Sequence, residues 1–358
     1  MKTLVVLLVS LCAIANAKGT PPTRERLAQE IERLRRDVTA KPDGDENWKQ
    51  VKPDVLANLT IASGALEAGR LLLALDAVNI ARASYRAMDV STGNPKVVSG
   101  GMDAFLTEWK RQDVEFANAE KELRNAHWKA PEALRAIEEI NAGRVRTLFQ
   151  SARGFAEVSG PGTGLYYLGN AEGSLESARY TQTLKFPAAG KPFPERSMMA
   201  DILVLQNQVL AAYKPPRSID RHSDFIRINA AIKYARELDD AKMYRGAMYQ
   251  YLEAIRNFAP LMDEGLKPAE ALQAEAAKFR SRIASSKADQ SIAQLLLEKA
   301  EYRLANAGPN GKDAALRTAQ GILFHALPAY YSVREKPAVA AAAVGKLVTV
   351  TLVRWPYT

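Results

Sequence analysis

Apolar residues recur every three or four positions through much of this chain, and this spacing constrains the fold more than any other feature. Three clear stripes run through residues 27–38, 74–88 and 293–304. Because 3.6 residues make one turn of an α-helix, each stripe lies along one helix face that has to be buried. The same segments are rich in Ala, Leu, Glu, Lys, Arg and Gln, the best helix formers. The sequence therefore predicts an all-α protein.

Turn-forming residues predict where the helices end. Glycine, proline, asparagine and serine cluster at four places, residues 41–44, 91–95, 159–162 and 307–311. The short connections favour antiparallel neighbouring helices. A longer stretch, residues 185–195, holds three prolines and a glycine. It predicts a joint between an N-terminal helical region, residues 18–184, and a C-terminal helical region, residues 196–336.

The C-terminal residues break the helical pattern. Residues 346–354 read KLVTVTLVR, in which β-branched residues alternate with the period of a β-strand. We expect residues 337–358 to form an extended, strand-like tail. This tail either lies over the helices and pairs with another extended segment of the chain, or adds to the sheet edge of a partner.

The first 17 residues have the layout of a secretory signal peptide: an early lysine, an apolar run and small residues before Ala17. The apolar run is shorter than a membrane-spanning helix requires. We therefore expect cleavage after Ala17, export to the periplasm or beyond, and a mature chain without a transmembrane segment. Lipid attachment at Cys12 is the alternative, but the bulky Leu11 before it disfavours a lipoprotein. Loss of Cys12 leaves a mature chain without cysteine, which excludes disulfides and a thiol nucleophile.

A helical hairpin is predicted between residues 224 and 260. Its second helix carries small and aromatic residues at four-four-three-four spacing, namely Met243, Ala247, Tyr251, Ala254 and Phe258. Close helix packing requires small side chains at the contact points, and aromatic side chains fill the gap one turn away. Pro260 ends the helix.

This hairpin resembles the tetratricopeptide repeat, a 34-residue helix-turn-helix unit. The match covers residues 228–260, where Ala235, Ala247 and Ala254 take the small positions and Tyr244 the aromatic one. The family's tryptophan and glycine positions are occupied by Ala231 and Lys242. Weaker matches to the repeat cover residues 66–95 and 165–181. The resemblance implies antiparallel hairpins stacked as a solenoid; the alternative is an irregular array of helices.

No pattern of residues in the chain indicates catalysis or metal binding. His222 lies among Asp220, Ser223 and Asp224, but neighbouring residues on one short segment cannot align as a hydrolase triad. The three histidines form no HExxH pair, and the acidic run at residues 43–47 lacks the glycine of a calcium loop. We predict no catalytic residue, no metal and no cofactor.

The predicted function is that of a non-enzymatic scaffold of the bacterial cell envelope, which binds a protein or peptide. Stacked helical hairpins present a long concave surface, and its usual ligands are peptides or other proteins. The resemblance places the binding residues on the first helix of each unit. They are Asn229, Ile232, Lys233 and Arg236 in the best unit, and Tyr166 and Asn170 in a weaker one.

Two other functions stay open. The mature chain has 48 Lys and Arg against 40 Asp and Glu once Lys2 is removed, a formal charge of +8 that favours an anionic polymer or cell-wall component. No run of five like charges exists, so nothing indicates nucleic acid specifically. The third function is hydrolysis at a site assembled only in three dimensions, with His222 or His127 facing a distant carboxylate.

Overall fold

The computed structural model describes residues 22–42, 46–125, 130–187, 190–215, 219–262, 265–308 and 311–335. Their regular structure is helical, apart from one isolated β-bridge between Lys191 and Ala288. The prediction of an all-α fold is confirmed. Among these residues no helix is long and apolar enough to cross a membrane. The predicted signal peptide and the predicted strand-like tail, residues 337–358, lie outside the described residues.

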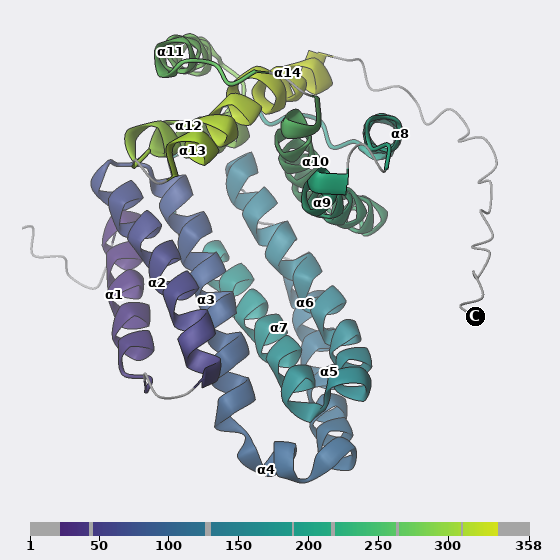
Figure 1. Ribbon diagram of the computed structural model, residues 1–358. Helices are drawn as coiled ribbons and strands as arrows, with labels where there is room; N and C mark the ends of the chain where they lie inside the picture. Colours follow the sequence, from purple (N-terminus) through teal and green to yellow (C-terminus); the bar gives the residue numbers. More distant parts are fainter. Residues whose placement is uncertain are drawn as a thin grey trace, which may run out of the picture.

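The N-terminal helices form a bundle (Figure 1). Its members are α1 (Thr23–Thr39), α2 (Glu46–Glu67), α3 (Leu71–Gly93), the short α4 (Pro95–Ser99), α5 (Gly101–Asn125), α6 (Glu132–Ser159) and α7 (Pro161–Gln182). The core of this bundle is made of alanine and large aliphatic side chains, for example the fully buried Leu59, Leu75 and Leu165.

Glycines bring α3 and α7 together at the centre of the bundle. A Cβ atom added at Gly169 would lie 2.4 Å from the carbonyl oxygen of Arg86, and one at Gly173 would lie 2.7 Å from the Cα of Ala83. No side chain fits between backbones at this separation. The two glycines therefore set how closely α7 packs on α3.

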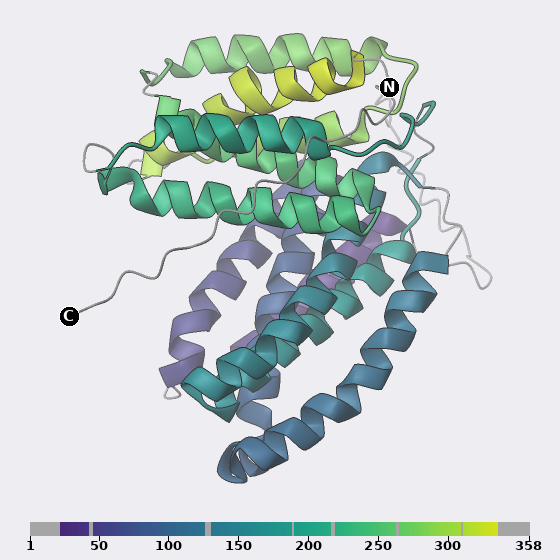
Figure 2. The same cartoon turned by 90° about the vertical axis from the view of Figure 1, so that its right-hand side faces the viewer.

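The C-terminal helices lie across one end of the bundle (Figure 2). They are α8 (Met199–Ala212), α9 (His222–Asp240), α10 (Tyr244–Phe258), α11 (Ala269–Ser285), α12 (Ser291–Ala305), α13 (Lys312–Gln320) and α14 (Leu327–Glu335). Shorter turns precede α9, follow α10 and join α13 to α14, namely η1 (Ile219–Arg221), η2 (Ala259–Met262) and the π-helical η4 (Gly321–Ala326). Helices α9, α10 and α12 contact α6 of the bundle, and α12 also contacts α3.

The predicted helix ends agree with the structure. Within two of the four turn-rich clusters one helix ends and the next begins: α3 ends at Gly93 before α4, and α6 ends at Ser159 before α7. The described residues of the other two clusters, 41–42 and 307–308, follow the ends of α1 and α12, and residue 311 precedes α13. The described part of residues 185–195 lies in the connection between α7 and α8. The division of the chain into two domains at this connection stays a prediction.

The predicted hairpin is present as α9 and α10. Its turn is closed by Lys242, the described non-glycine residue with a positive φ, 61°. The backbone amide of Met243 donates to the carbonyl oxygen of Leu238 at 2.8 Å, which closes the end of α9. The left-handed conformation thus occurs where the repeat family has glycine.

The buried face of α10 is wider than the predicted single stripe. Ala247, Ala254 and Phe258 are buried as expected, but Tyr251 is only half-buried. Tyr249 is also buried, although it lies off the predicted stripe. Helix α10 contacts α9, α6 and the π-helical segment η4, so more than one of its faces is covered.

Candidate binding cleft

A cleft of about 490 Å³ lies where the C-terminal helices meet the bundle. Helices α2, α3 and α6 of the bundle line it, together with α9, α10 and α12 of the C-terminal region. Its volume falls in the range of pockets that bury a small ligand. Its apolar wall comes mainly from the bundle: Ile61, Leu73, Ile80, Ile137 and Ile140.

A partly buried ionic network forms one wall of the cleft. The Nζ atom of Lys299 lies 2.8 Å from a carboxylate oxygen of Asp76 and 3.4 Å from one of Glu253. Arg256 pairs with the other oxygen of Glu253 at 2.9 Å. The network links α3, α10 and α12, and every charge in it has an opposite partner. It therefore ties the C-terminal helices to the bundle.

The opposite charges in this network determine the pKa values of its members. Burial alone would raise the pKa of Glu253, but the charges of Arg256 and Lys299 outweigh it and lower this pKa to about 2. Burial alone would lower the pKa of Lys299, yet Asp76 and Glu253 raise it well above its usual value. Both groups are therefore charged at neutral pH. The carboxylates of this wall are already neutralised by cations.

The α6 wall of the cleft is different, because it presents an amide oxygen without a hydrogen bond and a guanidinium without an ion pair among the described residues. Asn141 and Arg144 follow Ile137 and Ile140 on one face of α6. Asn141 is 4% exposed, and its side-chain oxygen accepts no hydrogen bond from the described residues. The half-buried Arg144 makes no ion pair within the described part of the chain. This wall offers one acceptor and one cation to a ligand.

Tyr234 of α9 contacts α6 next to these two residues. Its hydroxyl donates to the carbonyl oxygen of Ile140. Burial raises the pKa of this hydroxyl, and the nearby positive charge of Arg144 opposes the effect. Tyr234 is therefore a neutral donor, and it positions α9 against the α6 wall.

The cleft carries an excess of positive charge. Five cationic side chains line it, Arg144, Arg227, Arg256, Lys299 and Arg303, against the two carboxylates of Asp76 and Glu253. The lining residues therefore carry a net formal charge of +3. Arg227 also pairs with Asp224 at 3.2 Å, outside the cleft lining. The chemistry of the site thus combines apolar contact with recognition of an anion.

The predicted binding residues lie elsewhere. Asn229, Ile232, Lys233 and Arg236 are on α9 but do not line the cleft. Ile232 is buried, and Arg236 donates to Gln206 of α8 at 3.4 Å, so this face of α9 is directed toward α8. Lys233 is exposed. As a peptide groove, this face stays a prediction.

The two predicted residues of the weaker unit are on α7. Tyr166 and Asn170 are half-buried, and Tyr166 contacts the ring of Tyr167 edge-on at 5.7 Å. Like the predicted residues of α9, they do not line the cleft. His222 has a Tyr213 hydroxyl 2.8 Å from its Nδ1 atom, and His127 lies outside the described residues.

Sequence reasoning missed the cleft residues Asn141 and Arg144. The available signal was the spacing of residues 137, 140, 141 and 144, in which polar residues continue an apolar helical stripe. A polar residue in such a stripe is either paired in the core or directed into a cavity. Only the positions of α9 and α10 decide between these two outcomes.

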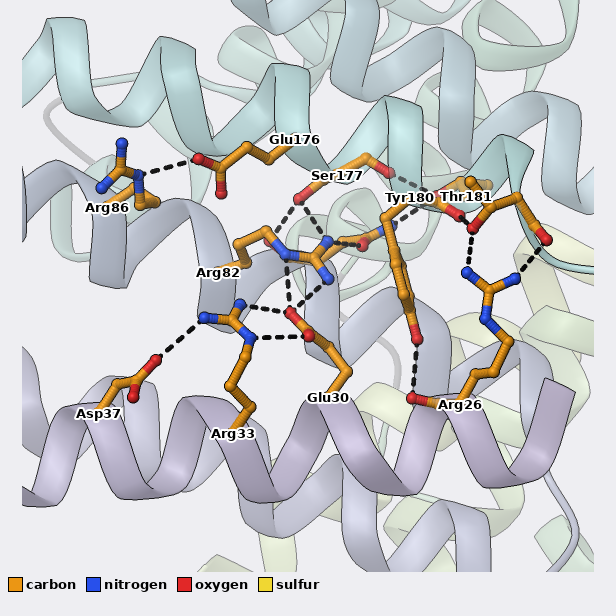
Figure 3. Close-up of polar contacts among 12 residues, drawn as sticks. Arg26, Glu30, Arg33, Asp37, Arg82, Arg86, Glu176, Ser177, Tyr180 and Thr181 are labelled. Atoms are coloured by element: carbon orange, nitrogen blue, oxygen red, sulfur yellow. Dashed lines mark hydrogen bonds and ion pairs between the residues drawn. The ribbon is translucent and has the colours of Figure 1, made fainter. Parts of the chain in front are cut away.

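A second polar cluster lies inside the bundle (Figure 3). Arg82 of α3 is 2% exposed, and its guanidinium donates to Glu30 of α1 at 2.7 Å, to Asn79 at 2.9 Å and to Ser177 of α7 at 3.2 Å. Arg33 also pairs with Glu30, at 2.6 Å. Burial alone would raise the pKa of Glu30, but Arg33 and Arg82 lower it. This cluster is saturated by the protein's own groups.

Other candidate sites are weaker. A cavity of about 350 Å³ between α5 and α6 is lined by the stacked rings of Trp109 and Phe149 and by Phe116. Within the described residues, no group of three or more His, Cys, Asp or Glu side chains could hold a metal ion. Comparisons of this chain with protein-family models, with curated proteins and with solved structures found no match.

Proposed function

We propose that this protein is an exported binding protein of the bacterial cell envelope, which holds a peptide segment of a partner protein without catalysing a reaction. The observation that carries the proposal is the cleft between the bundle and the C-terminal helices. It joins an apolar wall to an acceptor and a cation that lack partners among the described residues. A peptide supplies the matching groups, namely apolar side chains, backbone N–H donors and charged side chains.

The architecture supports a peptide as ligand. Helix α9 and helix α10 form the hairpin that resembles a tetratricopeptide repeat, and stacked hairpins of this kind commonly hold peptides. The cleft volume suits a few residues of an inserted segment. Export is proposed from the signal-like residues 1–17.

The test is affinity capture with the mature chain, residues 18–358, from an envelope extract of the source organism. Ala230 is exposed, lies on α9 and lines the cleft, so Ala230→Trp fills the cleft with little cost to folding. Ala274→Trp is the matched control, because Ala274 is exposed on α11 and lines none of the described cavities. Captured proteins are identified by mass spectrometry after washes at low and then high salt.

We expect one defined protein to be retained by the wild type and by Ala274→Trp, and to be lost from Ala230→Trp. Equal retention by both tryptophan variants would exclude the cleft as the binding site. Release of everything at high salt, or capture of polymer alone, would instead favour the basic surface as a binder of anionic polymer.

A further inference from the structure

We infer that the cleft selects an acidic segment, whose side-chain carboxylates pair with Arg144 and Arg303 and whose backbone N–H donates to Asn141. This inference rests on the proposed function and names the class of its ligand. The occupant is a peptide segment with at least two Asp or Glu residues and apolar residues between them.

Two cations of the cleft have no acidic partner among the described residues. Neither Arg144 of α6 nor Arg303 of α12 forms an ion pair within the described ranges. A guanidinium in a partly apolar cleft gains most from a carboxylate, which accepts two parallel hydrogen bonds from it. Arg144 is half-buried and Arg303 is exposed, and they lie on two different helices of the lining, α6 and α12. A ligand with two carboxylates can pair with each guanidinium separately.

The cleft already contains two carboxylates. Asp76 and Glu253 would repel an acidic ligand if they were free. Lys299 lies 2.8 Å from Asp76 and 3.4 Å from Glu253, and Arg256 lies 2.9 Å from Glu253. The acidic groups of the site are thus compensated by their own partners, and the uncompensated charge is positive.

The cleft also contains a buried hydrogen-bond acceptor. The amide nitrogen of Asn141 donates to the carbonyl oxygen of Ile137 at 2.7 Å, which fixes the orientation of the side chain. Its oxygen then remains without a hydrogen bond from any described group. A buried acceptor of this kind carries a free-energy penalty that a ligand donor removes. A backbone N–H beside the carboxylate bound to Arg144 supplies that donor.

The experiment uses three synthetic pools of nonapeptides with randomised apolar positions. The acidic pool carries Asp or Glu at two positions and is blocked at both ends. The neutral pool carries Asn or Gln there and is also blocked. The third pool is neutral with a free C-terminal carboxylate. Each pool is passed over the immobilised mature chain, and the peptide retained most strongly is then titrated against the variants.

Arg144→Gln removes the cation that the inference uses. Its matched control is Arg153→Gln, which makes the same change on the same helix at an exposed residue paired with Glu157, 2.9 Å away and outside the cleft. We expect enrichment from the acidic pool. We also expect roughly tenfold weaker binding to Arg144→Gln and unchanged binding to Arg153→Gln, as one lost charge-assisted hydrogen bond implies.

The outcomes separate the inference from the proposed function. Equal retention of the acidic and neutral pools, abolished by Ala230→Trp, would overturn the acidic selectivity and leave the peptide-binding function intact. Enrichment from the third pool would place the carboxylate at a chain end and overturn the side-chain assignment. Retention insensitive to Ala230→Trp, or no retention from any pool, would overturn both.

Discussion

Arg82 and Arg144 are the same residue type on two bundle helices, but their surroundings are opposite. Arg82 lies between α1, α3 and α7, where Glu30, Asn79 and Ser177 accept its hydrogen bonds. Arg144 lies on α6 beside the cleft and has no acidic partner among the described residues. The first arginine is part of the fold, since its charge is neutralised inside the protein. The second keeps its charge available for a ligand.

The comparison shows that the presence of an acidic partner decides whether an arginine stabilises the fold or can bind a ligand. A paired charge fixes the positions of the elements that supply its partners, and removing one partner leaves the other uncompensated. An unpaired cation at a cavity wall contributes little to stability and retains its capacity to bind. The same contrast should hold for other ionisable groups inside the protein, with stability changes that depend on how well each group is compensated.

The largest effect is expected for Arg82→Met. The substitution keeps an unbranched side chain but leaves Glu30 with Arg33 alone in a mostly buried site. We expect the free energy of unfolding to fall by about 4 kcal/mol, the size found when one partner of a buried pair is removed. Urea unfolding monitored by circular dichroism measures it. A loss below about 1 kcal/mol would mean that the cluster does not hold α1 to α3.

Glu138 is a buried carboxyl group whose environment disfavours its charged form. Burial and the neighbouring charge of Glu139 raise its pKa to about 8. A carboxyl group whose pKa is raised on folding favours the folded state at low pH, and this contribution is lost as pH rises from about 4.5 through 8. Glu138→Gln should therefore gain on the order of 3 kcal/mol at pH 8 and almost nothing at pH 4. Urea titrations at both pH values measure it; equal gains at both would contradict the pKa.

Glu253 should show the opposite pH dependence. Its pKa of about 2 in the folded protein is below the ordinary value, so its contribution is present above about pH 4.5 and is lost as pH falls toward 2. Glu253→Gln should cost about 2 kcal/mol at pH 7 and progressively less below pH 4.5. The same unfolding measurements from pH 7 to pH 3 test this. A cost that grows on acidification would show that Glu253 is not held by Lys299 and Arg256.

The sequence predicted the helices and their ends because both depend on local features. The stripe at residues 27–38 became α1, and the turn cluster at residues 159–162 separates α6 from α7. Even the α9–α10 turn was predicted, although Lys242 replaces the usual glycine. These features are set by neighbours a few residues apart, so periodicity and turn chemistry reveal them.

The candidate site was not predicted, because it depends on contacts between distant segments. Helix α9 has two polar faces, and the sequence does not show which of them borders a cavity. The resemblance favoured the face of Lys233 and Arg236, whereas the face of Arg227 and Tyr234 lines the cleft. Likewise, nothing local distinguishes Arg82 from Arg144. Their roles follow from partners on α1, α7, α9 and α12.

The most direct test of this account is the unfolding free energy of Arg144→Gln without ligand, measured by urea titration beside Arg153→Gln. If Arg144 serves binding and not folding, the variant should unfold within about 0.5 kcal/mol of the wild type and of its control. A loss of several kcal/mol, comparable to that expected for Arg82→Met, would contradict the account. Arg144 would then be a structural residue, and the main evidence that the cleft binds an anion would be lost.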